Sequence, residues 1–432
     1  MNKENFKAIC LVLIKLYKKL KIKLLFFLIF YSFLSFAQNI ERVKSNIDTL
    51  CSEEMFGRGY TQGGDTKAAH WISAFYQRIN LKNFNNSYFQ KFPLEVNLFD
   101  NELVVKLDKQ LLKVGEDFLP QSHSGSGKGT SKPVLLDERL FSDKDFQQNF
   151  LKMDLKGVAL IYPNEWNSKI MSLPENLLIK FFEADLHVAT VEKLTHSLSW
   201  EQFPTPSLLV LRKHLTTLPK KIHFDIKANL KQTISQNVVG FVRGTLQPDS
   251  FLVFTAHYDH LGGIGKDTYF AGANDNASGV AMLLELADYF SQHPQPYSVA
   301  FIAFSGEEAG LIGSRFYVEY PLFPLSQIKW LMNLDLIATG EKGATIVNGA
   351  VFKEEFDELV NLNKNGSYLP AILSRGKAAN SDHYFFSEKG GKSFFMYLMG
   401  DWTNYHDIYD KPPVPLTKFK ETFQLLVDFV EK

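Results

Sequence analysis

Between Gln236 and the C-terminal region, short apolar runs alternate with amphipathic stretches, and this alternation restricts the fold more than any other feature. Apolar runs predict strands, and amphipathic stretches with a repeat near 3.6 residues predict helices. The predicted strands are 238–242, 251–256, 298–304 and 328–336, and the predicted helices are 279–292, 311–319 and 417–430. Strands that alternate with helices form a largely parallel or mixed sheet with helices on both faces. We therefore predict an α/β fold with a mixed, mostly parallel central sheet.

The middle of the 432-residue chain has a different pattern. A Ser/Gly-rich loop at 121–131 is followed by short strand patterns at 156–162, 207–211 and 222–226. We predict a smaller β-rich inserted domain over residues 111–230. The main domain is then discontinuous and consists of residues 38–110 and 231–432.

The segment before the insert predicts helices with an interruption. Residues 40–74 have a helical pattern that is broken by the Gly-rich stretch 56–60. Asp65 stands where the N-cap of a helix over 66–79 is expected. This segment is interpreted as the beginning of the main domain.

Residues 1–37 have the three parts of a secretory signal peptide. Seven Lys and one Glu precede Gln38, an apolar run covers 24–34, and small residues stand at Ser35 and Ala37. We predict cleavage after Ala37 and a secreted protein, located in the periplasm or the medium. The alternative is an uncleaved membrane anchor, but the apolar run is shorter than the ~20 residues that span a bilayer. No stable membrane insertion is expected after cleavage.

Charge and cysteine content narrow the function further. The whole chain has a net charge of zero, so removal of the basic signal leaves a mature chain of about −6. This charge argues against nucleic acid as a partner, because phosphate binding needs clustered Lys and Arg. Cys10 leaves with the signal, and Cys51 then has no partner for an internal disulfide. For its stability, the mature chain must therefore depend on its hydrophobic core or on bound metal.

Residues that could bind a metal stand where the predicted strands end. His257 and Asp259 follow the strand 251–256, and a nearby carboxylate can fix the tautomer of a ligating imidazole. Asp275 stands among small residues, where each of its oxygens could approach a different metal. Glu307 and Glu308 are adjacent and point in different directions, so one can bind metal while the other accepts a proton from the attacking water.

Two further positions complete the set. Asp335 ends the strand 328–336, where a buried carboxylate is costly unless a cation pairs with it. His406 follows Tyr405 near the C-terminus. Taken alone, each motif has a simpler explanation as a structural histidine, a helix cap or an acidic turn, and for His383 the structural explanation is preferred. Five N/O ligands and a spare Glu at successive strand ends of one sheet instead favour zinc, with manganese or cobalt as substitutes in vitro.

In order and spacing, these motifs resemble the co-catalytic zinc aminopeptidase family. That family includes secreted bacterial leucyl aminopeptidases, glutamate carboxypeptidases and glutaminyl cyclases. The resemblance rests on residues 256–260, 272–279, 304–314, 333–335 and 405–406, and it covers roughly residues 236–415. It implies a zinc-dependent exopeptidase that removes N-terminal residues from peptides.

The resemblance also implies roles for individual residues, with two zinc ions per chain. Asp275 would bridge the ions. His257 and Asp335 would complete one site, and Glu308 and His406 would complete the other. Glu307 would be the general base, Asp259 would orient His257, and Tyr405 would polarise the scissile carbonyl. The peptide bond between Asp275 and Asn276 is expected to be cis.

The insert is similar to the protease-associated domain that such peptidases often contain. The similarity rests on residues 121–128 and 156–162, and the role suggested for that domain is to limit or guide substrate access. The chain departs from the family pattern at residues 381–386. Many relatives have Pro before the last Phe of this segment, whereas Tyr and Phe precede it here. This departure bears on the shape of the substrate pocket.

Three other functions share parts of this pattern. A glutaminyl cyclase has a related fold but needs one zinc ion. A carboxypeptidase or dipeptidase of the same family differs in the groups that hold the substrate termini. A receptor-like relative keeps the fold but lacks several ligands. Because every ligand is present, we favour the aminopeptidase with peptide substrates, and the oligomeric state stays open.

Overall fold

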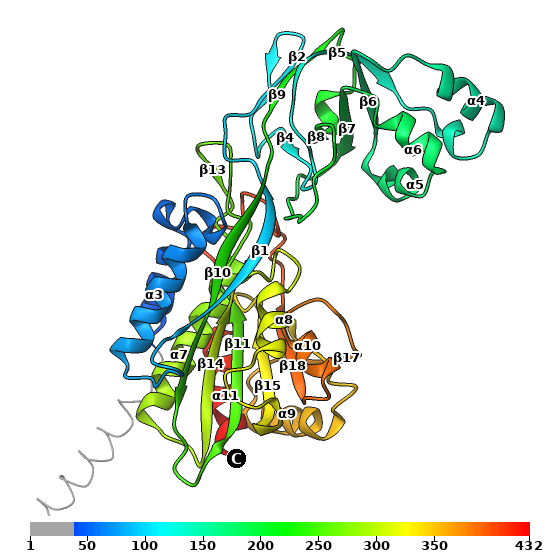
Figure 1. Cartoon of the computed structure of the whole chain (residues 1–432). Helices are drawn as coiled ribbons and strands as arrows, with labels where there is room; N and C mark the ends of the chain where they lie inside the picture. Colours follow the sequence, from blue (N-terminus) through cyan, green and yellow to red (C-terminus); the bar gives the residue numbers. More distant parts are fainter. Residues whose placement is uncertain (1–38) are drawn as a thin grey trace, which may run out of the picture. The chain divides into compact units, whose positions relative to one another are not determined.

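The structure is a computed structural model that describes residues 39–432, of which 43–432 form one unit. Its central sheet has eight strands in the order β1-β10-β14-β11-β15-β18-β16-β17 (Figure 1). In that order the strands are Phe89–Leu98, Asn229–Val242, Tyr297–Phe304, Gln247–His257, Ile328–Leu334, Ser393–Met399, Gly343–Val347 and Ile372–Arg375. The four middle strands β14, β11, β15 and β18 are parallel, and β1, β10 and β16 are antiparallel to their inner neighbours. The predicted signal peptide and its cleavage site lie outside the described residues.

Helices cover both faces of the central sheet. Neighbouring residues of a strand point to opposite faces, and on β11 Phe254 stacks on Phe290 of α7 (Gly279–Gln292). Val253 faces the other way, into an apolar cluster with Tyr317 of α8 (Ile312–Glu319) and Phe386 of α10 (His383–Glu388). Helix α11 (Phe419–Glu431) lies beside α7, and α9 (Lys353–Gly366) contacts α11. The predicted α/β fold with helices on both faces is confirmed.

The N-terminal helices are α2 (Ile40–Leu50), the short 3-10 helix Glu53–Arg58 and α3 (Gly64–Arg78). The prediction that Asp65 caps α3 is wrong, because the helix begins at Gly64, two residues earlier than predicted, and Gly63 is its N-cap. The Asp65 side chain is instead buried, and its carboxylate accepts a hydrogen bond of 3.0 Å from the hydroxyl of Ser235. A tertiary contact therefore replaces the local capping contact.

A second eight-stranded sheet, called here the insert sheet, has the order β3-β2-β9-β5-β6-β7-β8-β4. In sequence its strands are Val104–Leu107 (β2), Gln110–Leu111 (β3), Phe118–Pro120 (β4), Gly127–Leu135 (β5), Val158–Pro163 (β6), Leu186–Val191 (β7), Ser207–Leu211 (β8) and Ile222–Ile226 (β9). Helices α4 (Lys144–Lys152), α5 (Asn167–Met171) and α6 (Glu175–Phe181) pack with one face of β6 and β7. The sheet begins before residue 111, and the division of the chain at residues 111 and 230 stays a prediction.

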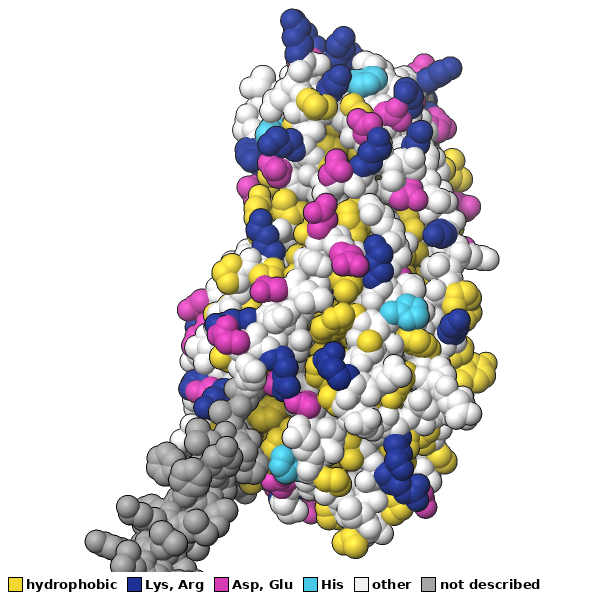
Figure 2. All heavy atoms as spheres, turned by 90° about the vertical axis from the view of Figure 1, so that its left-hand side faces the viewer, with side chains coloured by type: hydrophobic (Ala, Val, Ile, Leu, Met, Phe, Trp, Pro, Cys, Tyr) yellow, Lys and Arg dark blue, Asp and Glu magenta, His cyan; other side chains and the backbone are white. Residues whose placement is uncertain are grey.

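No helix within residues 39–432 combines the length and the apolar character that crossing a bilayer requires. On the face drawn in Figure 2, basic and acidic side chains are interspersed with apolar ones.

Candidate metal centre and active site

Three neighbouring strands of the central sheet end at the same edge, and each leads into a predicted site residue. His257 is the last residue of β11, Glu307 and Glu308 follow β14, and Asp335 follows β15. These residues meet because β11 pairs in parallel with both other strands, and parallel strands have their carboxyl ends on one side. The helical turn Ala273–Ser278 supplies Asp275, and the loop of residues 400–411 supplies His406.

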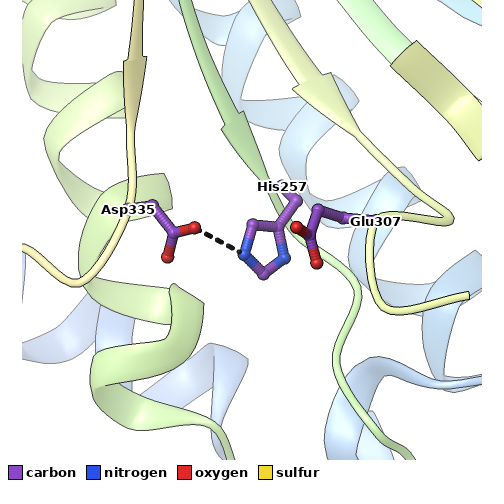
Figure 3. Close-up of side chains that lie close together, drawn as sticks. All are labelled: His257, Glu307 and Asp335. Atoms are coloured by element: carbon purple, nitrogen blue, oxygen red, sulfur yellow. Dashed lines mark ion pairs between the residues drawn. The ribbon is translucent and has the colours of Figure 1, made fainter. Parts of the chain in front are cut away.

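The imidazole of His257 lies between two carboxylates. Its Nε2 is 3.4 Å from Oδ1 of Asp275 and 3.3 Å from Oδ2 of Asp335. Its Nδ1 is 3.1 Å from the main-chain oxygen of Asp259. Donation of Nδ1–H to that oxygen leaves the Nε2 lone pair free to bind a metal. Figure 3 shows the ring with Asp335 on one side and Glu307 on the other.

His406 faces the other oxygen of the Asp275 carboxylate. Its Nε2 is 3.1 Å from Oδ2 of Asp275 and 3.3 Å from Oε2 of Glu308. Asp275 therefore turns one oxygen towards each histidine. His260 holds the other oxygen of Glu308 through a contact of 2.6 Å with Nδ1. The structure thus brings together all five predicted ligands, with Asp275 between the two histidines.

The site concentrates negative charge where water is largely excluded. Burial raises the pKa of Glu307 well above its ordinary value, and burial also raises the pKa of Asp335. For Asp275 burial acts in the same direction, but hydrogen bonds with His257 and His406 bring its pKa well below the ordinary value. Among the described residues, the buried atoms Asp335 Oδ1 and His260 Nε2 have no hydrogen-bond partner.

A divalent cation would balance the negative charge of the site and would give the unpartnered Asp335 oxygen an interaction partner. Ligand atoms of His257, Glu307 and Asp335 lie within 4.8 Å of one another, and so do those of His257, Asp275 and Glu308. Nitrogen and carboxylate oxygen without thiolates form a donor set that zinc accepts. The residues present therefore fit zinc.

The side chain of Asp259 lies closer to Glu307, the candidate base, than to His257. Its Oδ1 is 3.8 Å from Nδ1 of His257, beyond hydrogen-bond distance, but it accepts a hydrogen bond of 3.3 Å from the main-chain N–H of Glu307. Its Oδ2 accepts a hydrogen bond of 3.1 Å from the hydroxyl of Tyr60. The carboxylate of Asp259 thus positions the loop of Glu307, and its carbonyl orients His257.

Arg58 is a supporting residue that the sequence analysis did not identify. Its side chain is fully buried, and it donates hydrogen bonds of 2.7 to 2.9 Å to the carbonyls of Leu50, Tyr258, Ala271 and Gly272. The segments that carry His257 and Asp275 are thereby tied to the N-terminal helices. The only local signal is an Arg between two glycines, and Gly59 is required there because a Cβ would lie 2.4 Å from Cα of Gly262.

Asp410 supports the main chain of the segment that carries Asp275. Its two oxygens accept hydrogen bonds of 2.9 and 3.0 Å from the main-chain N–H groups of Asn274 and Asp275. The peptide bond between Asp275 and Asn276 is cis, as expected. The Asn276 side chain accepts a hydrogen bond of 3.0 Å from the N–H of Gly279, the first residue of α7.

A cleft of about 390 Å³ opens over these residues. Tyr405 lines it, and its ring stacks on His406 with 4.0 Å between centroids, while the side chain stays half-exposed. Arg375 and Asn380 line the cleft as well. His383 does not line it: its side chain is buried and its ring lies 5.5 Å from that of Phe395.

The insert contacts the loop that carries His406. The segment between β7 and β8, residues 192–206, is called here the insert loop. The main-chain N–H of His196 donates a hydrogen bond of 2.9 Å to the carbonyl of His406, and the carbonyl of His196 lies 3.1 Å from Nδ1 of His406. Lys193 forms an ion pair of 2.6 Å with Asp407. A segment from the insert sheet therefore orients a predicted metal ligand.

Comparison with known proteins identifies a family domain that contains the candidate metal ligands. Residues 237–430 match the model of peptidase family M28. The chain therefore carries a peptidase family M28 domain. Aminopeptidase YwaD of Bacillus subtilis (strain 168) is 28% identical over 327 residues, which cover 70% of this chain and 67% of that protein. A probable zinc metalloprotease of Pyricularia oryzae is 35% identical over 111 residues, which cover 25% of this chain and 22% of that protein.

Solved structures have the same fold as this chain. The zinc aminopeptidase BSAP from Bacillus subtilis superposes with a TM-score of 0.68 at 20% identity, covering 91% of this chain and 95% of that one. The aminopeptidase from Aneurinibacillus sp. strain AM-1 gives a TM-score of 0.60 at 17% identity, covering 91% and 92%. The resemblance inferred from the motifs is confirmed: residues 237–430 match peptidase family M28, and the match together with the similar proteins supports a zinc-dependent aminopeptidase hydrolase.

Proposed function

We propose that this M28 protein removes N-terminal residues from peptides with two zinc ions per chain. The observation that carries the proposal is the placement of Asp275, whose two oxygens face His257 and His406 at 3.4 and 3.1 Å. His257 and Asp335 would hold one ion, Glu308 and His406 would hold the other, and Asp275 would bridge them. A glutaminyl cyclase, which needs one zinc ion, would not need both sets of ligands.

In the proposed reaction, zinc would activate the attacking water and polarise the scissile carbonyl. Glu307 would accept the proton of that water and later donate it to the leaving amine. Burial raises the pKa of Glu307, which makes its carboxylate a stronger proton acceptor. Asp259 would position Glu307 through its main-chain N–H, and the half-exposed hydroxyl of Tyr405 would donate a hydrogen bond to the carbonyl oxygen.

We also propose that the enzyme acts outside the cytoplasm, in the periplasm or the medium. This rests on the signal-peptide pattern of residues 1–37. The insert would act as a protease-associated-like unit that guides peptides into the cleft. Trp200 of the insert loop supports that role, because its ring packs on Gly310, two residues after Glu308.

Replacement of the proposed base tests the mechanism directly. Glu307→Gln is expected to lower kcat for aminoacyl-4-nitroanilides by about 10²–10⁴-fold, because the amide cannot accept the proton. Zinc content, measured by elemental analysis, is expected to stay at about two ions per chain.

Glu308→Gln is the matched control for this experiment. It removes a ligand rather than the base, so it is expected to lose zinc together with activity. Wild-type turnover by Glu307→Gln would refute its role as base. Cyclisation of N-terminal Gln peptides without release of a residue would instead support the glutaminyl cyclase.

A further inference from the structure

The insert contains a second cavity, of about 200 Å³, whose lining residues are different from those of the active-site cleft. It lies among β6, β7, β8, helices α5 and α6, and the insert loop. Its apolar walls include Phe181, Phe182 and Phe203. The role proposed above for the M28 site makes no use of this cavity.

One wall of the cavity is polar. His187 on β7 is opposite Ser207 on β8 in the sheet register, and the N–H of Gln121, which follows β4, donates to the carbonyl of Ser207. His187 is 1% exposed, and neither of its ring nitrogens has a hydrogen-bond partner among the described residues. The side-chain atom Ser207 Oγ is also buried and unpartnered there, and Gln121, whose amide interacts with the hydroxyl of Tyr162, completes the wall. Buried polar groups are normally hydrogen-bonded, so this wall offers donors and acceptors to a ligand.

The polar wall carries no charge near neutral pH. Burial lowers the pKa of His187 to about 3, and burial also lowers the pKa of His123, the other histidine in the lining. No Asp, Glu, Lys or Arg belongs to the lining. A charged ligand would lose its hydration without gaining an opposite charge, so the cavity selects uncharged groups.

The remaining walls favour a flat ring. Phe181 stacks on His187 with 4.3 Å between centroids, Phe182 meets the same imidazole edge-on at 5.5 Å, and His123 lies 4.2 Å from Phe203. An apolar cavity of ~150 Å³ is large enough to bind benzene. The cavity here therefore has room for one ring and a small polar substituent.

We propose that this cavity binds one uncharged aromatic ring that carries a hydrogen-bonding group, of the phenol type. The ring stacks against Phe181 and Phe203, and its hydroxyl exchanges hydrogen bonds with His187 and Ser207. The same chemistry occurs in a free phenol and in the tyrosyl side chain of a peptide.

Titration calorimetry of the full mature protein with p-cresol and with N-acetyl-tyrosinamide tests the proposal. Saturable binding of either probe with one site per chain is the expected result. Binding of p-cresol alone identifies a free small molecule as the ligand, whereas tighter binding of the peptide analogue identifies a tyrosyl side chain. Toluene, which lacks the hydroxyl, and benzoate, which is charged, are expected to bind at least about tenfold more weakly.

Two variants locate the site. His187→Phe keeps a ring against Phe181 but removes both nitrogens, and Ser207→Ala removes one hydroxyl; each is expected to weaken binding about tenfold or more. His223→Phe is the matched control, since His223 lies on β9 of the same sheet and outside the cavity lining. The proposal is overturned if neither probe binds at millimolar concentration, if toluene binds as well as p-cresol, or if both variants bind like wild type.

Discussion

Arg58 connects segments that are far apart in the sequence. Its guanidinium donates to carbonyls at Leu50, Tyr258, Ala271 and Gly272, so one side chain fixes the end of α2 and two loops of the metal site. The planar fork of arginine can reach several carbonyls in fixed directions, whereas lysine presents a compact point charge. The site geometry therefore depends on a residue that binds neither metal nor substrate.

We predict that Arg58→Lys lowers the free energy of unfolding by about 2–4 kcal/mol, because buried carbonyls lose their donors. Urea unfolding of the zinc-free protein measures this change without a contribution from metal binding. The exposed Arg78 at the end of α3 provides the control, and Arg78→Lys should change stability by less than about 0.5 kcal/mol. Equal losses in the two variants would show that the four hydrogen bonds contribute little.

A second residue-scale prediction concerns pH. The pKa of His187 in the folded state is about 3, below its ordinary value of 6.5, so the unfolded chain binds the proton more readily. The stabilisation by neutral His187 is complete above pH 6.5 and falls as pH decreases from 6.5 towards 3. Between pH 7 and pH 5 this residue alone is expected to cost about 2 kcal/mol.

His187→Phe has no such proton and should lose correspondingly less stability over that interval. The measurement is urea unfolding at both pH values, with His223→Phe as control. An unchanged pH slope in His187→Phe would contradict the prediction.

The insert loop acts at the scale of elements, because it joins the insert sheet to the loop of His406. Lys193 forms an ion pair with Asp407 and donates a hydrogen bond of 2.9 Å to the carbonyl of Thr403. His196 adds main-chain contacts with His406 itself. Groups that orient a ligating histidine commonly change metal affinity when they are removed.

We predict that Lys193→Met weakens the binding of the zinc ion held by His406 about tenfold, because the 400–411 loop loses two of its contacts. Competition with a chromophoric chelator measures this affinity independently of turnover. Lys213→Met changes an exposed lysine of the same insert and should leave zinc affinity unchanged. Identical affinities for the two variants would mean that the insert loop does not support the ligand.

Sequence patterns predicted the elements well where the periodicity was clear. The strands 207–211 and 222–226 and the helix 279–292 have the predicted bounds, because apolar periodicity follows directly from burial. His257, Glu308 and Asp335 lie at strand ends as predicted, whereas Asp275 lies on a helical turn and His406 in a loop, and the role of all five as ligands stays a prediction. Arg58, His260 and Asp410 were missed as supporting residues, since their contacts join segments up to 214 residues apart and leave no local periodic signal.

At the scale of the whole molecule, the candidate ligands come from five separate places in the chain. A cation bound there joins the ends of β11, β14 and β15 to the turn of Asp275 and the 400–411 loop. Any ligand that binds only the folded state stabilises it by mass action. Zinc should therefore contribute to folding stability as well as to chemistry.

We predict that removal of zinc with EDTA lowers the Tm of the mature protein by several degrees, since a free ion at ~1,000 times its Kd contributes about 4 kcal/mol. Differential scanning calorimetry with and without EDTA measures the shift. Asp275→Asn, which weakens the proposed bridge between the two zinc ions, is expected to show a smaller shift. A Tm that is insensitive to EDTA would argue against tightly bound metal.

The strands β1 and β10 pair along their length from Phe89 opposite Val238 to Leu98 opposite Asn229. They form an antiparallel pair, and the residues of the insert sheet connect the end of β1 to the beginning of β10. Because the end of β1 and the beginning of β10 lie side by side, connections of different length can join them without rearranging the central sheet. In this chain a different connection between β1 and β10 would lose the contacts that the insert loop makes with the loop of His406. The new connection would have to replace those contacts.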